Sequence, residues 1–136
     1  LKISAQDVGC ALLPIHFSYG LSILSSHLCA GAAVLLTDMA VTSGRFWKMA
    51  RRWSVSQMPG VPFHYGVFST FGFEPLDFET LTVLTQAGGK LDPEIASKAH
   101  AFMEAKGGAF YTMYGQTEAG PRMTTLDNAD FPPPPG

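Results

Sequence analysis

The chain has 136 residues, which is one domain's worth of sequence at most. Hydrophobic residues make up 46% and charged residues 15%, so a sizeable core can form and a disordered chain is excluded. The net charge of −2 favours neither nucleic acid nor an anionic membrane as a partner, and no apolar run is long enough to span a membrane.

Apolar runs alternate with helix-period stripes along the chain. Five apolar runs are expected to form strands, at residues 8–13, 32–36, 55–58, 81–86 and 109–111. Four helices are expected between them, at residues 20–30, 43–53, 63–71 and 92–106. This alternation predicts an α/β fold with a mostly parallel sheet flanked by helices.

The helical stripes also predict which side chains face the core. In the first three helices these are Leu21, Leu24, Leu28, Phe46, Trp47, Ala50, Trp53, Phe63, Val67, Phe68 and Phe71. The last helix has a strong start signal, because Asp92 is an N-cap acid and Pro93 suits the first helical turn. Pro59 is expected to stop the third strand at Met58.

The two ends of the chain suggest its organisation. Residues 1–128 are expected to form one α/β domain, and the proline-rich residues 129–136 a linker or surface loop. The chain opens without an initiator Met or a signal peptide, so we expect a piece of a longer, cytoplasmic protein. Cys10 and Cys29 lie in apolar contexts that suit reduced core thiols, although a disulfide between them stays open.

Residues 114–118, Tyr-Gly-Gln-Thr-Glu, carry the richest chemistry in the chain. Gly115 is expected to break the last strand, so that the following side chains project from a loop. In α/β proteins, ligands bind beside the carboxyl ends of the parallel strands. Taken alone, the same stretch is equally typical of an ordinary turn after a core strand.

The motif at residues 114–118 resembles the Tyr-Gly-x-Thr-Glu motif of the adenylate-forming superfamily, which includes acyl-CoA synthetases, aryl-CoA ligases, luciferases and the adenylation domains of peptide synthetases. Residues 13–20 resemble the family's Leu-Pro-x-x-His segment, residues 60–62 its Val-Pro turn, and residues 86–91 its glycine-pair segment. The resemblance covers nearly the whole chain. It implies a partial N-terminal domain of the adenylate-forming fold.

The resemblance implies a nucleotide site on two of these segments. Gly88 and Gly89, followed by Lys90, would line the adenine, since a backbone without Cβ atoms can lie flat against a purine. The ring of Tyr114 would stack on the adenine, with Gly115-Gln116 beside it. A plain strand-to-helix turn and a core tyrosine are the alternatives for the two segments.

Phosphate, metal and acid contacts are implied in the same way. Thr117 would bond the α-phosphate, and Glu118 would help to hold Mg²⁺, which needs only one or two carboxylates beside phosphate oxygens. The alternative for this pair is a helix start. His16 would border the acyl site, although a lone His is more often structural. Other aromatic residues could wall an acyl pocket or serve as core, namely Phe17, Tyr19, Phe63, His64 and Tyr65.

The activity implied by the resemblance has two steps. A carboxylic acid reacts with ATP to give an acyl-adenylate, and the thiol of coenzyme A or of a carrier-protein pantetheine then displaces AMP. The family's Lys-ending phosphate loop, Thr-Gly-Asp segment and C-terminal lid are not among these 136 residues. We therefore expect the rest of a parent enzyme as partner, and an inactive chain by itself. A non-catalytic α/β scaffold domain is the alternative function, and exposed sheet edges would also allow a homo-oligomer.

Overall fold

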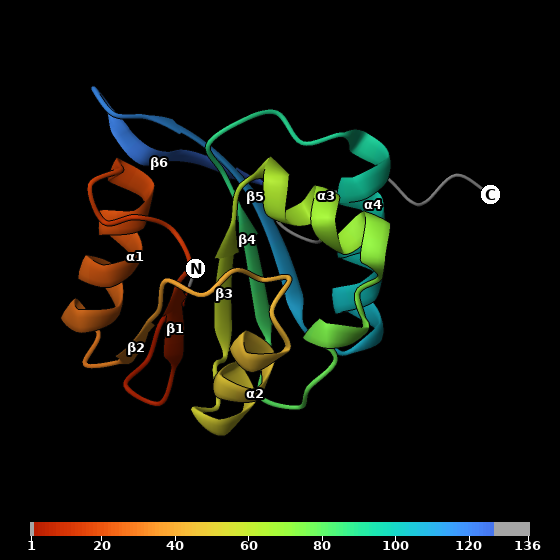
Figure 1. The fold of residues 1–136 in the computed structure, drawn as a ribbon. Helices are drawn as coiled ribbons and strands as arrows, with labels where there is room; N and C mark the ends of the chain where they lie inside the picture. The colour runs from red at the N-terminus through yellow and green to blue at the C-terminus, as the bar shows by residue number, and fades with distance from the viewer. Residues whose placement is uncertain (1, 127–136) are drawn as a thin grey trace.

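The computed structural model describes residues 2–126, which form a six-stranded sheet with helices on both faces (Figure 1). The strands are β1 (Val8–Ala11), β2 (Ala33–Leu36), β3 (Gln57–Gly60), β4 (Val83–Gln86), β5 (Ala109–Gln116) and β6 (Gly120–Leu126). Their order in the sheet is β2-β1-β3-β4-β5-β6. Strands β1 to β5 run parallel, and β6 is antiparallel to β5. The predicted α/β fold with a mostly parallel sheet is thus confirmed.

The helices are α1 (Ser18–Cys29), α2 (Gly44–Arg52), α3 (Pro62–Phe71) and α4 (Pro93–Ala105), with a short 3-10 helix η1 (Glu74–Leu76) before β4. The chain passes from β1 to β2 and then turns back past β1 to β3. Right-handed crossovers therefore place α1 on one face and α2, α3 and α4 on the other. Two core clusters follow this division, one containing Tyr19 and Ile23 of α1 and the other containing Phe46, Tyr65 and Met103.

Local sequence signals account for helix ends at three positions, of which Asp92 was predicted. Asp92 caps α4 because its Oδ1 accepts a hydrogen bond of 2.8 Å from the N–H of Glu94. Ser43 caps α2 by accepting from the N–H of Arg45 at 3.3 Å. Gly107 follows α4 with φ +69°, the left-handed conformation that glycine adopts readily after a helix.

The structure corrects the predicted end of the third strand. Pro59 lies inside β3, where it pairs with Thr85 of β4, and β3 continues to Gly60. Proline lacks a backbone donor, which normally excludes it from a central strand. Here β3 pairs with β1 only at Gln57, so no pairing with β1 remains for Pro59 to interrupt.

The structure also corrects the end of the last predicted strand. Strand β5 does not break at Gly115 but runs to Gln116, turns, and returns as β6, which the sequence did not reveal. Gly115 is required there because an added Cβ would meet the carbonyl group of Pro121 and lie 2.6 Å from the carbonyl oxygen of Gly120. Residues 117–119 therefore form the tip of a β-hairpin, and they do not start a helix.

Helix α1 presents a different face to the sheet from the predicted one, and it begins at Ser18, two residues before the predicted start. Leu21 and Leu28 are 53% and 59% exposed, whereas Ile23 and His27 are buried. The cause lies on β1, where Gly9 leaves room for the His27 ring. A Cβ at Gly9 would lie 2.7 Å from that ring. A glycine on a distant strand thus sets the rotation of the helix.

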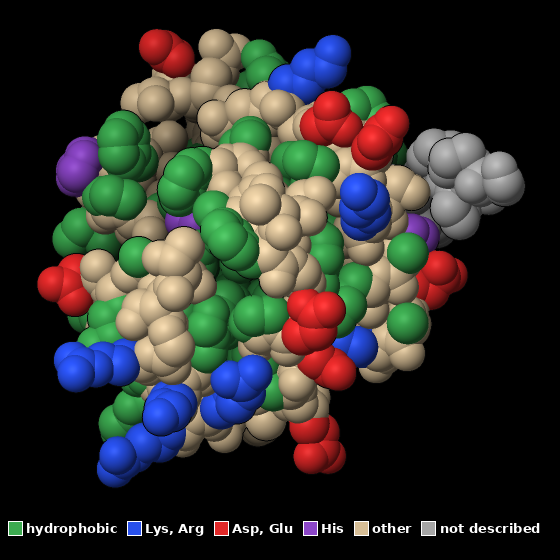
Figure 2. Space-filling view, turned by 45° about the vertical axis from the view of Figure 1, so that its right-hand side comes forward, with side chains coloured by type: hydrophobic (Ala, Val, Ile, Leu, Met, Phe, Trp, Pro, Cys, Tyr) green, Lys and Arg blue, Asp and Glu red, His purple; other side chains and the backbone are tan. Residues whose placement is uncertain are grey.

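Several further side chains predicted for the core are exposed. Trp53, Phe63 and Phe71 are all more than half exposed, while Tyr65 and Phe68 take the core positions of α3. Figure 2 shows apolar side chains lying open among polar and charged ones on the face that it presents.

The two cysteines also differ in their surroundings. Cys10 is buried as predicted, but Cys29 is exposed, and both thiols are free. The predicted core position of Cys29 is therefore wrong.

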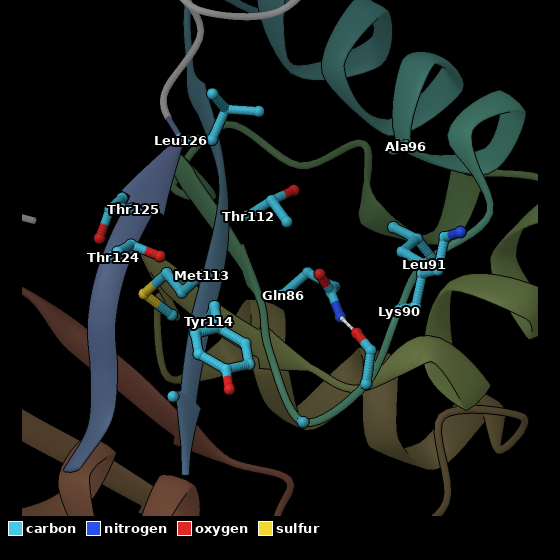
Figure 3. A pocket seen from close by; sticks show the side chains of 13 residues that line it. Gln86, Lys90, Leu91, Ala96, Thr112, Met113, Tyr114, Thr124, Thr125 and Leu126 are labelled. Atoms are coloured by element: carbon cyan, nitrogen blue, oxygen red, sulfur yellow. Dashed lines mark hydrogen bonds between the residues drawn. The ribbon is translucent and has the colours of Figure 1, made fainter. Parts of the chain in front are cut away.

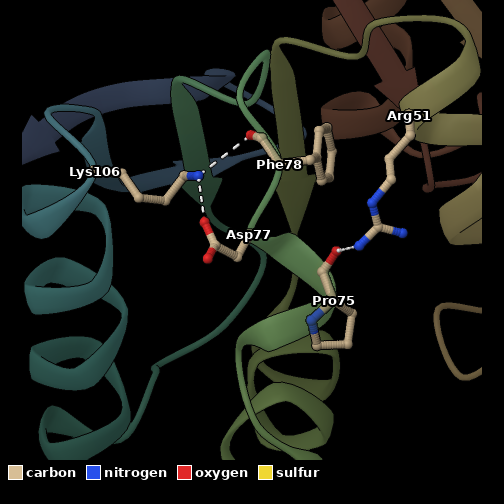
Figure 4. Close-up of polar contacts among 5 residues, drawn as sticks. All are labelled: Arg51, Pro75, Asp77, Phe78 and Lys106. Carbon is tan, nitrogen blue, oxygen red and sulfur yellow. Dashed lines mark hydrogen bonds and ion pairs between the residues drawn. The ribbon is translucent and has the colours of Figure 1, made fainter.

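The segment that leads into β4 is held from both sides (Figure 4). Lys106 forms an ion pair of 2.8 Å with Asp77 and donates to the carbonyl oxygen of Phe78 at 3.2 Å. Arg51 of α2 donates to the carbonyl oxygen of Pro75 at 2.9 Å, and its guanidinium lies over the Phe78 ring. These contacts fix the amino end of β4 between α2 and α4.

Within residues 2–126, no helix combines the length and apolarity that a membrane crossing needs. The proposed division between residues 1–128 and the proline-rich residues 129–136 falls outside the described residues.

Candidate functional site

Two clefts open beside the carboxyl ends of the parallel strands. The α4-side cleft has a volume of about 880 Å³ and is lined by residues that include Gln86, Gly89, Lys90, Thr112, Tyr114 and Thr124. The α1-side cleft has a volume of about 660 Å³ and is lined by residues that include Leu13, Phe17, Tyr19, Pro62, Phe63 and Thr117. Both clefts are lined by Gly88 and Gly115, so they meet at these two glycines. The chain reverses its direction across the sheet beside β1, which is where ligands bind in open α/β sheets.

The wall of the α4-side cleft is a tight turn after β4 (Figure 3). Gly88 has φ +81°, a conformation that side chains with a Cβ rarely adopt. A Cβ there would also lie 3.2 Å from Val61, because the turn packs on the loop before α3. Gln86 donates from its side-chain amide to the carbonyl oxygen of Gly89 at 2.8 Å. This bond holds the turn in place from inside the sheet.

The opposite wall comes from the β-hairpin. Tyr114 is 59% exposed, and its ring lies at the cleft between β5 and the turn after β4 (Figure 3). Its backbone pairs with Thr124 of β6, so the hairpin ladder fixes the position of the ring's attachment point. An aromatic ring and a glycine turn thus lie on two sides of one open space.

The α1-side cleft is lined mainly by apolar residues, and its lining residue Tyr19 belongs to a buried hydrogen-bonded group. Among its lining residues there is no Asp, Glu, Lys, Arg or His. The hydroxyl groups of Tyr19 and Thr85 are hydrogen-bonded at 2.8 Å, and Tyr65 donates to the Thr85 carbonyl oxygen at 3.0 Å. Burial raises the pKa of Tyr19 to about 12, so its phenol stays neutral near pH 7.

Helix α1 and the hairpin are joined by polar contacts. The hydroxyl groups of Ser18 and Thr117 are 3.4 Å apart. Arg122 of β6 donates to the hydroxyl oxygens of Ser22 and Ser26 at 3.1 and 3.3 Å. Burial lowers the pKa of Arg122 from its ordinary value. These contacts set the position of the hairpin tip relative to the first turn of α1.

The structure brings most of the sequence-predicted site residues together. Gly88, Gly89, Lys90, Tyr114 and Gly115 line the α4-side cleft, and Gly88, Gly115, Gln116 and Thr117 line the α1-side cleft. Of the aromatic residues predicted as pocket wall or core, Phe17, Tyr19 and Phe63 line the α1-side cleft, Tyr65 is core, and His64 accepts a hydrogen bond from the N–H of Val61.

Two predicted site residues lie outside the clefts. His16 is exposed, and its ring packs against Phe17 with 4.5 Å between centroids. It is not among the lining residues of either cleft. Glu118 is exposed at the hairpin tip. Across the described residues there is no group of three or more His, Cys, Asp or Glu side chains that would hold a metal by themselves.

Sequence reasoning missed five polar side chains at the clefts. Gln86, Thr112, Thr124 and Thr125 line the α4-side cleft, and Ser18 lines the α1-side cleft. A usable signal exists for Gln86, since it is an uncharged polar residue in a strand whose residues are mostly buried. Ser18 gives no comparable signal, because serines are common where helices begin.

Comparison with known proteins gives a family and a fold. The family model described as AMP-binding enzyme matches residues 1–136. A search of curated protein sequences gave no match to the chain.

Solved structures match with high coverage of this chain. The N-terminal subdomain of NpsA from Klebsiella oxytoca, in complex with 3-hydroxybenzoyl-AMSN, has a TM-score of 0.77 at 15% identity, over 91% of this chain and 30% of that one. The o-succinylbenzoate CoA synthetase MenE from Bacillus subtilis, in complex with the acyl-adenylate intermediate OSB-AMP, has a TM-score of 0.78 at 22% identity, over 95% of this chain and 25% of that one. The same enzyme in complex with AMP has a TM-score of 0.75 at 21% identity, over 94% of this chain and 25% of that one.

At these identities the matches show a shared fold. They confirm the prediction that the chain has the fold of part of an N-terminal adenylate-forming domain. The chain spans between a quarter and a third of the length of these matched structures.

Proposed function

The chain belongs to the AMP-binding enzyme family, as its motifs predicted, and we propose that the full-length protein activates a carboxylic acid with ATP. The products of this step are an acyl-adenylate and pyrophosphate. The observation that carries the proposal is the pair of clefts that meet at Gly88 and Gly115. One cleft suits the base of the nucleotide and the other suits the acid. The acid's carboxylate and the α-phosphate would then react where the clefts join.

The base would lie in the α4-side cleft. Gly88 and Gly89 offer flat peptide groups to one face of a purine, and Tyr114 offers an aromatic ring to the other. Lys90, after the glycine turn, and Gly115-Gln116, at the end of β5, would border the nucleotide. The solved structures of NpsA and MenE, which hold an acyl-AMSN and AMP or acyl-AMP, support a nucleotide on this fold.

The acid would lie in the α1-side cleft, with its body against apolar walls. Phe17 and Phe63 at the opening and Leu13 inside suit a hydrocarbon or aromatic body. The cleft offers no carboxylate to an α-ammonium group, so a neutral-bodied acid fits better than an amino acid. His16, packed on Phe17, would border the mouth of this cleft.

The chemistry that we assign to this chain is positioning. An oxygen of the carboxylate attacks the α-phosphorus while the bond to the β-phosphate breaks, and pyrophosphate leaves with that electron pair. The hydroxyl of Thr117 would donate to an α-phosphate oxygen as charge shifts in the transition state. No protein nucleophile is needed, which agrees with Cys10 being buried with a pKa raised to about 12.

Glu118 suits a divalent cation held mainly by the nucleotide. It is an exposed carboxylate next to Thr117, and Mg²⁺ commonly takes one or two carboxylates with phosphate and water oxygens. A bound Mg²⁺ would neutralise phosphate charge.

The second half-reaction would transfer the acyl group from AMP to the thiol of coenzyme A or of a carrier-protein pantetheine. It would need the rest of the parent enzyme, so we expect this chain alone to be inactive. The free thiols of Cys10 and Cys29 support a cytoplasmic location.

The proposal is tested by ATP–pyrophosphate exchange on the full-length protein with a panel of carboxylic acids. We expect acids with an apolar or aromatic body to drive exchange, and Glu118→Ala to lower the rate more than tenfold. Glu104→Ala is the matched control, because it removes another exposed carboxylate, on α4. If the folded protein shows no exchange with any acid, the proposed activity is refuted and the non-catalytic scaffold function is favoured.

A further inference from the structure

We infer that the open edge of β2 pairs with the same edge of a second copy of this protein, so that two antiparallel β2 strands join the sheets of a homodimer. The inference goes beyond the proposed activity, because no residue of β2 lines either cleft. It assigns a partner to an apolar surface that the described residues leave open at one side of the sheet (Figure 1).

Strand β2 is an edge strand without the usual protection. It comes first in the strand order, and among the described residues it pairs only with β1. Charges, prolines and bulges normally keep such edges from pairing with other chains, and Ala33–Leu36 contains neither a charge nor a proline. The register with β1 is continuous from Val8 to Ala11, so no bulge bends the strand away. The edge is therefore open to another strand.

An apolar groove with a volume of about 400 Å³ lies beside this edge. The residues that line it are Val8, Ala33, Val34, Leu35, Leu36 and Trp53. Leu36 is 65% exposed and Trp53 is 59% exposed, although neither lines a cleft. Large apolar side chains that gather at one open surface mark a protein–protein contact. A further apolar strand suits this groove because it would cover both side chains.

The backbone groups at the open edge belong to Val34 and Leu36. The N–H of Ala33 donates to the carbonyl oxygen of Asp7 at 3.1 Å, so Ala33 directs its backbone groups toward β1. Successive residues of a strand direct these groups to opposite sides, which leaves those of Val34 and Leu36 at the open edge. In an antiparallel pair about a two-fold axis, Val34 would exchange hydrogen bonds with Leu36 of the second copy, and Leu35 would lie on the axis. This register uses all the outward backbone groups of both strands.

The charges at the two ends of β2 favour a second copy over other apolar strands. Asp38 is exposed, two residues after the carboxyl end of β2. Arg52 is exposed at the end of α2 and lies toward the amino ends of the strands, because the N–H of Ser56 already bonds to Val8 of β1. An antiparallel pair brings the carboxyl end of one strand to the amino end of the other. Asp38 of each copy would therefore approach Arg52 of the other copy.

The test measures the mass of the full-length protein by sedimentation velocity between about 1 and 100 µM. We expect a dimer whose dissociation constant rises at least about tenfold in Leu36→Lys, because a lysine on an edge strand opposes pairing. Phe71→Lys is the matched control, since it changes another exposed apolar residue, on α3, and should leave the dimer intact. Both variants should keep the melting temperature of the wild type.

Disulfide cross-linking tests the register in a Cys29→Ala background, which lacks the exposed native thiol. Leu35→Cys should link two copies under mild oxidation, because residues that face each other without hydrogen bonds have Cα atoms about 4.5 Å apart. Ala33→Cys is the control. Ala33 is exposed, but it would lie opposite Thr37 of the second copy and away from Ala33 of that copy, so this variant should stay unlinked.

Three results would overturn the inference. A full-length protein that stays monomeric over the whole concentration range would leave the β2 edge to the remainder of the parent protein. A dimer that Leu36→Lys and Phe71→Lys weaken alike would place the interface elsewhere. Equal linking of Leu35→Cys and Ala33→Cys would exclude the antiparallel register.

Discussion

Replacing Gly115 by alanine tests whether the two clefts depend on the close packing of the hairpin. The added Cβ would lie 2.6 Å from the Gly120 carbonyl oxygen and would also meet the carbonyl of Pro121. Non-bonded heavy atoms normally keep well over ~3 Å apart, so the returning strand must move by about 1 Å or more. Overpacking of this kind costs roughly 1–3 kcal/mol. The shift would also displace the Tyr114 ring and the Thr117 hydroxyl from their places at the clefts.

Gly66→Ala is the matched control for this substitution. Gly66 lies inside α3, and a Cβ there would meet nothing within 4 Å. Alanine should therefore stabilise that helix by about 0.5–1 kcal/mol. Differential scanning fluorimetry of the full-length protein should show a lower melting temperature for Gly115→Ala and an equal or higher one for Gly66→Ala. Calorimetry should show at least tenfold weaker AMP binding for Gly115→Ala only. If both variants behave alike, the reasoning about the hairpin is refuted.

Three further predictions concern buried polar groups. Burial raises the pKa of Cys10 from 9.0 to about 12. The contribution of the buried thiol to the free energy of unfolding is therefore complete below pH 9, and above pH 9 it falls by up to ~1.4 kcal/mol per pH unit. Between pH 9 and 10 the free energy of unfolding, measured by denaturation, should depend less on pH in Cys10→Ala than in the wild type, and Cys29→Ala should behave like the wild type. Equal pH dependence in the two variants would contradict this prediction. Tyr19→Phe should cost about 1–3 kcal/mol, because it leaves the buried Thr85 hydroxyl without its partner, and a melting temperature equal to that of the wild type would count against it. Arg122→Met should lower kcat in the exchange assay and leave the melting temperature nearly unchanged, because the contacts of Arg122 with Ser22 and Ser26 hold the hairpin on α1. An unchanged kcat would show that the β5–β6 ladder alone holds the hairpin.

Local sequence signals predicted the parts of the fold that depend on few residues. The start of α4 follows from Asp92 and Pro93, which need only their own turn of helix to act. The parallel strands follow from short apolar runs, such as β1 with its buried Cys10 and Ala11. These features depend on neighbours in the sequence, so they can be recognised there.

The remaining fold features depend on residues that are distant in the chain. The face of α1 is set by the fit of His27 over Gly9, eighteen residues away, so leucine periodicity alone misplaced it. Strand β6 was missed because its last four residues are exposed and Gly115 suggested a break. That glycine in fact permits a close approach between two strands. A single sequence does not distinguish these two uses of glycine.

At the site, the motif residues could be predicted from the sequence, but the buried polar residues beside them could not. Gly88, Gly89 and Tyr114 were expected around one space, and the structure places all three along one cleft. The unpaired oxygens of Gln86 and Thr112 become visible only when β4 and β5 lie in register. Hydrogen-bond vacancies of this kind are properties of packing, and no local pattern encodes them.

The central claim is that nucleotide and acid occupy the two clefts that meet at Gly88 and Gly115. The most direct measurement is a crystal structure of the full-length protein with an acyl sulfamoyladenosine, whose acyl group is chosen from the exchange assay. We predict the adenine between the Tyr114 ring and the Gly88 turn, with the acyl group in the α1-side cleft against Phe17. An analogue bound elsewhere, or bound with its base in the α1-side cleft, would contradict the claim.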